Sequence, residues 1–408
     1  MRAVVVGGGL AGLAAALELA DTGHEVTLLE ARPTLGGAVQ TLPERDGDPS
    51  PPPDNGQHIA LGCFTEYLRF LDRIGEGGSY RRIRLDLPVI GTDRRVGVIG
   101  RSRSSFLRYR HLPLGDRLRV ANAVRHLPEH GSRSETFGSL LRELGCSDAS
   151  IGSFWDVFVR PALNLSTDEV SAEWGVFTVR TALLAERAAS DVILPARPLG
   201  WMHGVAAGRA LEAAGVTIRS DARVASLEDV DADAVVLAVP PDECARLLGE
   251  PDPGLEHSPI VSVHLLFDRR LLDHALVALL SSDAHWVFDR GFLTGHEPKT
   301  GQYLTVVSSG VPELMEIRGR ELVDRIAGQL VQRLGYAELL WSRVSREPLA
   351  TLALRPGVQR PSLHTARQEV VRAGAWTDTG WPATMEGAVR SGVAAARALA
   401  RPLHEVAA

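Results

Sequence analysis

The sequence predicts an α/β fold in which a parallel sheet carries a second, discontinuous domain. Three observations support this prediction. A βαβ pattern opens the chain at residues 2–29, a buried type of strand returns at residues 234–239, and a glycine turn followed by a helical pattern occupies residues 372–400. Apolar runs of this kind suit parallel strands that are covered on both faces. We therefore expect the two ends and the middle of the chain to share one sheet.

The first strand runs directly into a glycine-rich turn. Residues 4–6 are apolar and β-branched, and residues 13–20 after the turn are rich in alanine and leucine, as in a helix. The first glycine of such a turn permits a tight bend, the second lets the backbone approach a pyrophosphate, and the third lets helix and strand pack closely. The sequence therefore predicts a Rossmann-like, dinucleotide-binding unit. The residues expected at the ligand are Gly7, Gly9, Leu10, Ala11 and Gly12.

A second apolar strand at residues 26–29 ends on Glu30, eighteen residues beyond Gly12. A carboxylate at this place accepts hydrogen bonds from a ribose diol and would repel a 2′-phosphate. Ala31 and Arg32 follow directly, and we expect them to line the same site. The alternative is a βαβ unit that only packs.

Composition narrows the class of protein. The 408 residues suffice for two or three domains, and 45% hydrophobic with 23% charged residues is ordinary for a soluble globular chain. The net charge of −6 argues against nucleic acid as a partner. The three cysteines, Cys63, Cys146 and Cys244, fit reduced thiols and no metal site. No apolar stretch reaches eighteen residues, and a strand at residue 2 leaves no room for a signal peptide, so we expect a cytoplasmic protein.

Periodicity divides the chain into two discontinuous domains. Helical spacing of Phe64, Tyr67, Leu68, Leu71 and Ile74 begins a mostly helical stretch that we expect to reach residue 190. Strands are predicted at 215–218, 222–227, 260–267, 286–289 and 303–308, and a helix at 312–334. We assign residues 1–75, 200–255 and 350–408 to the nucleotide-binding domain. Residues 76–199 and 256–349 form the substrate domain, a mixed β-sheet with a helical insert.

Seven arginines against one acid, Asp116, lie between residues 101 and 125. The arginines are Arg101, Arg103, Arg108, Arg110, Arg117, Arg119 and Arg125, and the apolar stripe beside them is Leu114, Leu118, Ala121, Val124 and Leu127. A basic amphipathic helix suits an anionic membrane surface. We expect residues 101–128 to allow peripheral association with the inner face of the cell membrane; the alternative is a solvated helix packed on its own protein.

Further motifs carry a resemblance to a known family. The run from Glu30 to the glycine pair Gly36 and Gly37 resembles flavoprotein oxidases and desaturases of the amine oxidase and phytoene desaturase superfamily, in which this pair bends the chain around FAD. Residues 54–64, DNGQHIALGCF, are similar to a segment of the hydroxysqualene dehydroxylases. Matches to the same family lie at residues 258–269, 286–290 and 376–392, and the whole runs in order from residue 3 to residue 393, more loosely over 76–190.

The resemblance implies a Rossmann-like FAD-binding domain and reductive removal of the hydroxyl of hydroxysqualene by reduced FAD, giving squalene, water and oxidised FAD. The electron donor to FAD stays open. The protein would have to hold a long apolar substrate, exclude water and supply a proton to the departing oxygen. Two rivals remain. One is a flavin oxidase or desaturase acting on another polyene or an amine, and the other is a non-catalytic isoprenoid binder of the GDP-dissociation-inhibitor type.

The resemblance also implies site residues. Asp54 and His58 are the leading proton donors and Asp378 is the third, although Asp54 could serve only as a turn former, His58 as a backbone partner and Asp378 as a helix cap. A helix beginning at Thr384 would aim backbone N–H groups at the flavin pyrimidine. The other residues placed at FAD are Gly36, Gly37, Val224, Gly374, Ala375 and Met385. Two departures from the family pattern are Ala38 in place of arginine and Ala375 in place of aspartate.

Overall fold

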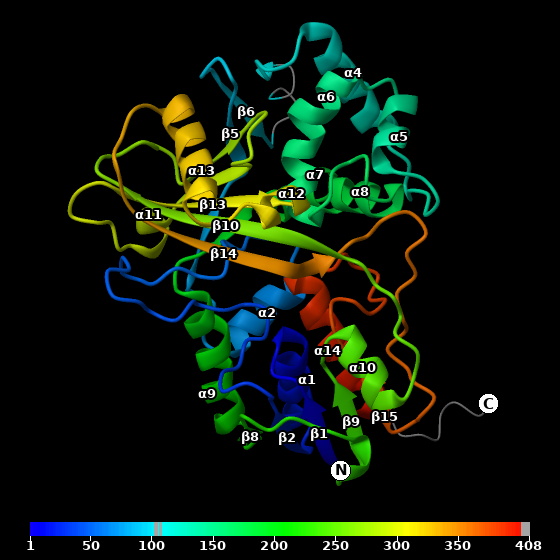
Figure 1. The fold of residues 1–408 in the computed structure, drawn as a ribbon. Coiled ribbons are helices and arrows are strands. Elements are labelled where there is room, and N and C mark those ends of the chain that lie inside the picture. Colours follow the sequence, from blue (N-terminus) through cyan, green and yellow to red (C-terminus); the bar gives the residue numbers. More distant parts are fainter. Residues whose placement is uncertain (102–104, 106–107, 401–408) are drawn as a thin grey trace.

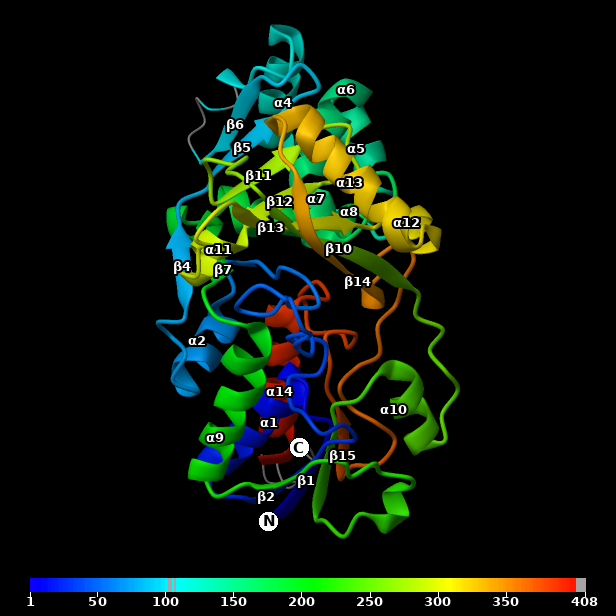
Figure 2. The same ribbon diagram turned by 60° about the vertical axis from the view of Figure 1, so that its left-hand side comes forward.

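The computed structural model describes residues 1–101, 105 and 108–400. Three sheets organise these residues (Figure 1). Figures 1 and 2 agree in placing a five-stranded sheet with its helices at one end of the molecule and a seven-stranded sheet at the other. The α/β fold predicted from the sequence is confirmed.

The five-stranded sheet is parallel throughout, in the order β15-β9-β1-β2-β8. Its strands are β1 (Arg2–Val6), β2 (Glu25–Leu29), β8 (Thr217–Arg219), β9 (Ala234–Leu237) and β15 (Val370–Arg372). Both faces are covered, as the apolar runs require. The helices α1 (Leu10–Asp21), α9 (Ala206–Ala213) and α14 (Met385–Ala400) pack on the face of Ala3 and Val5, and α10 (Pro241–Leu248) packs on the face of Val4 and Val6. The expected joining of distant segments in one sheet is confirmed, whereas the exact domain boundaries stay a prediction.

The seven-stranded sheet is mixed and has the order β14-β10-β13-β12-β11-β5-β6. Its strands are β5 (Asp86–Ile90), β6 (Val96–Gly100), β10 (His257–Phe267), β11 (Leu276–Leu279), β12 (Trp286–Asp289), β13 (Gln302–Ser309) and β14 (Leu339–Leu352). Helix α13 (Gly319–Leu334) covers one face. Helices that include α7 (Asp156–Leu163) cover the other face. The loop that carries Asp54 and His58 also approaches this face, since a side chain on Gly56 would lie 3.1 Å from Ser262 Oγ of β10.

Three predicted elements were wrong. Residues 222–227 do not form a strand, since only residues 217–219 of this region pair with β2. The helix expected at 312–334 is two helices, α12 (Pro312–Glu316) and α13, because Ile317 and Arg318 are extended and Gly319 has a φ of +58°. The stretch expected to be mostly helical also contains strands, namely β4 (Tyr80–Ile83), β5 and β6. Strand β4 joins β3 (Ala60–Leu61) and β7 (Val192–Pro195) in a third sheet.

The other predicted helices and strands are observed, including the helix at Tyr67 and Leu71, which is α2 (Thr65–Arg73). Further α-helices are α4 (Leu114–His126), α5 (Phe137–Glu143), α6 (Asp148–Ser150), α8 (Ala172–Val179) and α11 (Arg290–Thr294). Short π-helical turns lie at Ile151–Trp155, Arg180–Leu184 and Gly200–Val205, and 3₁₀ turns at Arg187–Ser190 and Leu227–Asp229.

Helix α4 does not bury the predicted apolar stripe as one face. Val120 and Ala123 turn inward together with Asp116, whereas Leu114 and Leu118 are exposed. Arg103 of the predicted basic segment lies outside the described residues. Within the part of the chain that the structure describes, no helix has the length and apolar character needed to cross a membrane.

Candidate active site

The glycine turn brings β1 and α1 into close contact. Gly7 has a φ of +103°, which favours glycine, and a side chain on Gly12 would lie 1.8 Å from the Gly7 carbonyl oxygen. Helix α1 begins after Gly9, and no side chain caps it there. A helix N-terminus in this condition offers backbone N–H groups and a positive dipole end to an anion. Leu10 and Ala11 form the first turn of this helix.

Glu30 is almost completely buried at the end of β2, beside the glycine turn. One carboxylate oxygen accepts a hydrogen bond from Gly8 N at 2.6 Å, and the other accepts one from Arg32 N at 2.8 Å. The Arg32 and Ala31 residues themselves are exposed. Each carboxylate oxygen keeps a further lone pair, so Glu30 fits the ribose diol that the sequence assigns to it.

The glycine pair at residues 36 and 37 lies against the glycine turn. Gly36 N donates to Gly8 O at 2.8 Å, and Gly36 and Gly37 have φ values of +111° and +61°. A side chain on Gly37 would come within 2.7 Å of Gly9 Cα. The two loops can therefore approach this closely only because residue 37 is glycine. The turn, Glu30 and this pair together form a backbone cradle that fits the ADP half of FAD.

The first turn of α14 is held by a residue that sequence reasoning did not single out. The buried Glu386 carboxylate accepts hydrogen bonds from Glu66 N and Tyr67 N at 3.1 and 2.7 Å, and from Arg390 Nε at 2.7 Å. Burial raises the pKa of this carboxyl, and its N–H donors oppose the rise. Glu386 thereby caps helix α2 and fixes the position of the turn at Thr384 and Met385. Thr384 Oγ1 accepts a hydrogen bond from Gly387 N at 3.3 Å, so Thr384 caps α14.

The loop before α14 is equally constrained. Gly374 has a φ of +153° and donates its N–H to Ser391 Oγ at 2.8 Å. The neighbouring Ala375 carbonyl oxygen lies 3.5 Å from a guanidinium nitrogen of Arg360, a side chain that also lies 4.6 Å from the centre of the Trp174 ring. The Arg360 cation therefore lies beside Ala375, the residue that stands where the family pattern has aspartate.

Ala38 and the predicted FAD contact Val224 both use their carbonyl oxygens within the protein. Ala38 is exposed, and its carbonyl accepts a hydrogen bond from Asn55 Nδ2 at 2.9 Å. The Val224 carbonyl accepts one from Arg246 Nη2 at 3.2 Å. Contact of Val224 with FAD stays a prediction, and Ala38 stands where the family pattern has arginine.

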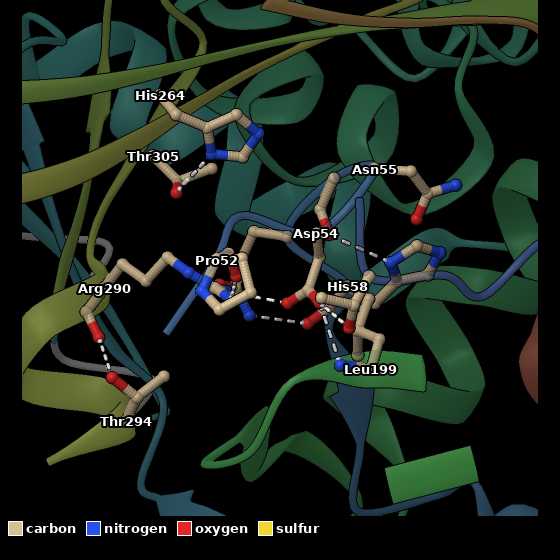
Figure 3. Close-up of polar contacts among 12 residues, drawn as sticks. Pro52, Asp54, Asn55, His58, Leu199, His264, Arg290, Thr294 and Thr305 are labelled. Atoms are coloured by element: carbon tan, nitrogen blue, oxygen red, sulfur yellow. Dashed lines mark hydrogen bonds and ion pairs between the residues drawn. The ribbon is translucent and has the colours of Figure 1, made fainter. Parts of the chain in front are cut away.

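Asp54 is the centre of a buried polar network (Figure 3). Oδ1 accepts hydrogen bonds from Thr41 Oγ1 and Leu199 N at 2.7 and 2.9 Å. Oδ2 forms an ion pair with Arg290 Nη1 at 2.7 Å, in which both side chains are 2% exposed. Arg290 also donates to the Pro52 carbonyl at 2.8 Å. With both oxygens engaged by donors, Asp54 is suited to hold its loop in place rather than to release a proton.

His58 lies in the same loop, and its Nδ1 is 3.2 Å from the Gly56 carbonyl oxygen (Figure 3). Because a carbonyl only accepts, Nδ1 carries the proton and Nε2 of the neutral ring has a free lone pair. Burial lowers the pKa of His58, and the Gly56 hydrogen bond and the nearby Asp54 charge oppose the decrease. His58 is therefore neutral at neutral pH.

Asp378 lies apart from these two residues. Its carboxylate is half exposed, 3.5 Å from Arg360 Nη2, and Gly380 N donates to it at 3.4 Å. Among the described residues no hydrogen bond or ion pair joins Asp378 to Asp54 or His58. The residue that caps α14 is Thr384 and not Asp378, so the helix-cap alternative for Asp378 is wrong.

The structure adds His264 and Arg290 to this region. His264 is fully buried on β10, its Nδ1 is 3.0 Å from Thr305 Oγ1 on β13, and burial lowers its pKa to about 3, with the positive charge of Arg290 acting in the same direction (Figure 3). Both residues stand within segments that carry the family resemblance. Arg290 follows the apolar run Trp286–Phe288 closely in the sequence, and a charged residue at such a place is a signal for a buried ion pair.

Comparisons with known proteins agree with this geometry. Residues 10–400 match the family described as flavin containing amine oxidoreductase. The hydroxysqualene dehydroxylase of Rhodopseudomonas palustris is 30% identical over 96% of each chain, and the zeta-carotene desaturase of Synechocystis is 24% identical over 98% of this chain and 97% of its own.

Solved structures share the fold. An oxidoreductase from Methanosarcina mazei matches with a TM-score of 0.75 at 18% identity, covering 97% of this chain and 99% of its own. Cyclohexylamine oxidase from Brevibacterium oxydans matches with a TM-score of 0.73 at 18% identity, covering 98% of each. The expected family resemblance and the expected FAD cofactor are confirmed. The chain belongs to the flavin-containing amine oxidoreductase family and is an FAD-dependent oxidoreductase.

Proposed function

We propose that the protein removes the hydroxyl group of hydroxysqualene reductively, with squalene and water as products. The observation that carries the proposal is similarity along the whole chain to two relatives named hydroxysqualene dehydroxylase, at 30% and 29% identity. When bound and reduced, FAD supplies a hydride. The chain itself must then bind the hydrocarbon, exclude water and deliver a proton to the departing oxygen.

The surroundings of Asp54 favour a hydrocarbon over an amine. The Asp54 carboxylate is not free to pair with a cationic amine, because Arg290 already neutralises it. On the sheet face that carries His264, the neighbouring side chains include Phe288, Val307 and Trp286, all buried and apolar or aromatic. Apolar surroundings of this kind favour a hydrocarbon over a charged ligand, which would lose its hydration without gaining a partner.

His58 is the candidate that can handle a proton in this setting. Its neutral ring leaves Nε2 as an acceptor for a substrate hydroxyl, and a protonated ring would donate to the departing oxygen. Because the pKa of His58 is lowered, a rate that depends on its protonated form rises as the pH falls below neutral. His58→Asn removes this pH dependence if His58 supplies the proton, whereas an unchanged profile assigns the proton elsewhere.

Anaerobic reduction of the purified holoenzyme followed by addition of hydroxysqualene tests the reaction. We expect oxidation of the flavin with squalene formed in equal amount. Turnover of an amine or another polyene with oxygen, and no reaction with hydroxysqualene, would instead identify an oxidase or desaturase. Because the chain is an FAD-dependent oxidoreductase, we set aside the alternative of a non-catalytic isoprenoid binder.

We further propose that α4 docks the protein on an anionic lipid surface on the cytoplasmic side. Leu114 and Leu118 are 63% and 56% exposed one helical turn apart, and Arg110, Arg119 and Arg125 are exposed near them. Figures 1 and 2 place α4 at the end of the molecule away from the five-stranded sheet. Leucine side chains inserted between lipids and arginines at the headgroups are the arrangement that an interfacial helix needs.

A further inference from the structure

Glu347 lies on β14, on the sheet face that meets the DNGQH loop, residues 54–58. Strand pairing places Ser345 directly opposite Ser262 of β10, and Glu347 follows two residues later in the same register. Residues opposite one another share a face of the sheet, and so do alternate residues of one strand. A side chain on Gly56 would lie 3.1 Å from Ser262 Oγ, so this is the face that the loop approaches. Glu347 therefore stands on the loop side of the sheet.

The pairing of β14 with β10 is interrupted directly after Glu347. Ile260 pairs with Glu347, but Ser258 pairs with Thr351, so residues 348–350 of β14 lie opposite a single residue of β10. An irregularity of this kind bends a strand and changes the direction of its side chains, and it is frequent next to active sites. Glu347 is thus the last residue of the regular ladder before the bend.

The Glu347 carboxyl is half-buried beside the loop. Burial raises the pKa of this carboxyl, while hydrogen bonds from Asn55 and Ser345 and the positive charge of Arg32 oppose the rise. A carboxyl with a raised pKa keeps its proton to a higher pH than an ordinary glutamate does. Asp54, by contrast, is held as a carboxylate by its buried ion pair. Of these two acidic side chains, Glu347 is the one that can carry a proton.

Asn55 links this carboxyl to the FAD cradle. Its Oδ1 accepts a hydrogen bond from Gln40 N at 3.3 Å, and its Nδ2 donates to the Ala38 carbonyl at 2.9 Å, both just after the glycine pair of the cradle. An amide nitrogen has two N–H groups, so the second is left for Glu347. Figure 3 shows this amide directed away from the Asp54 carboxylate. Glu347 thus lies where the loop, the cradle and the seven-stranded sheet meet.

We propose that Glu347 is a catalytic residue and that its carboxyl gives the proton that leaves with the substrate hydroxyl. The inference rests on the proposed function, because it takes the substrate to carry a hydroxyl group that departs. As the carbon–oxygen bond breaks, the oxygen takes the Glu347 proton and leaves as water. The carbon receives the hydride that reduced FAD supplies, and the Glu347 carboxylate regains a proton from solvent. Neutral His58 accepts a hydrogen bond from the hydroxyl through Nε2 and so orients it.

Single-turnover oxidation of the reduced holoenzyme by hydroxysqualene tests this role. Glu347→Gln keeps the size of the side chain and accepts a hydrogen bond from Asn55, but it has no acidic proton. We expect the rate of flavin oxidation to fall by about a hundredfold or more. The flavin content and the binding of hydroxysqualene to the oxidised holoenzyme, read from the flavin spectrum, should stay as in the natural protein. Glu338→Gln, an exposed residue just before β14, is the matched control and should keep the natural rate.

The pH dependence of the rate separates Glu347 from His58 and requires no Glu347 variant to fold. A rate that depends on the protonated carboxyl falls as the pH rises through the pKa of Glu347, and it should do so equally in the natural protein and in His58→Asn. A Glu347→Gln protein that reacts at the natural rate, or a His58→Asn protein that has lost the pH dependence, overturns the inference alone. A natural protein whose reduced flavin is not oxidised by hydroxysqualene overturns the proposed function and this inference with it.

Discussion

Asp54 and Arg290 form a buried ion pair that joins the loop carrying Asp54 and His58 to the end of β12. Their side chains are 236 residues apart in the chain, 2.7 Å apart in space and 2% exposed. The pair holds the DNGQH loop against the seven-stranded sheet, next to His264. Its position explains how a short loop motif and a distant strand segment can both belong to one site.

Removing one member of this pair leaves the other charge buried without its partner. We expect Asp54→Ala to lower the free energy of unfolding by about 3–5 kcal/mol. The change should be visible in the urea midpoint of the holoprotein. Asp378→Ala is the matched control, because this half-exposed carboxylate should contribute less than about 1 kcal/mol. Equal effects of the two substitutions would contradict the structural role assigned to Asp54.

Glu30 should decide whether the protein retains FAD. Its carboxylate holds two backbone N–H groups of the nucleotide cradle, and a charged hydrogen bond is worth about 1.5–3 kcal/mol. With Ala38 and Ala375 where the family pattern has charged residues, fewer other contacts are available to compensate. Glu30→Ala should therefore lose flavin on purification, measured as the ratio of flavin to protein absorbance. Glu25→Ala, on the exposed start of the same strand, should keep it, and a yellow Glu30→Ala protein would refute this view.

The sequence predicts the local parts of this molecule well. The glycine turn, Glu30 and the strands β10, β12 and β13 are specified by neighbouring residues, since turn geometry and strand periodicity act over a few positions. Strands β4 to β6 were missed because they are short, and β4 and β5 carry charged residues or proline. They are stabilised by pairing with β7 and β11, far along the chain.

The chemistry of the site depends even more on distant contacts. Asp54 looked like a proton donor from its motif, but only Arg290, Thr41 and Leu199 reveal that its oxygens are engaged. Glu386 likewise has no local signal for its role, because its partners on α2 lie 319 and 320 residues away. A motif fixes which residues enter a site, and long-range packing fixes what each can do there.

Buried histidines should make stability depend on pH. Burial lowers the pKa of His203 to about 4 and that of His285 to about 4. A folded-state pKa below the ordinary value of about 6.5 means that the unfolded chain binds more protons as the pH falls, so stability is lost between about pH 6.5 and 4. The loss from His203 alone is up to about 3 kcal/mol. His203→Asn should show a shallower decrease in urea midpoint over this range, whereas the exposed His126→Asn should follow the natural protein.

Binding to lipid vesicles should depend on the exposed leucines of α4. We expect the protein to sediment with vesicles that contain phosphatidylglycerol and to be released as salt is raised, since the arginines contribute by charge. Leu114→Ser with Leu118→Ser should weaken sedimentation. Leu340→Ser with Leu349→Ser, which alters equally exposed side chains on β14, is the control. Similar losses in both double variants would show that α4 is not the contact.

Two glycine-to-alanine substitutions should change stability in opposite directions. A side chain on Gly392 of α14 would lie 2.0 Å from the Ala11 carbonyl oxygen of α1, so the helices would have to separate, and we expect a loss of about 1–3 kcal/mol. Gly328 of α13 has no atom within 4 Å of an added Cβ, so alanine there should raise stability by about 0.5–1 kcal/mol through helix propensity. Thermal unfolding of the holoprotein measures both.

Because α1 also carries the glycine turn, Gly392→Ala should in addition weaken flavin retention, whereas Gly328→Ala should not. A Gly392→Ala protein as stable and as yellow as the natural one would show that the close approach of α1 and α14 is not needed to shape the FAD cradle.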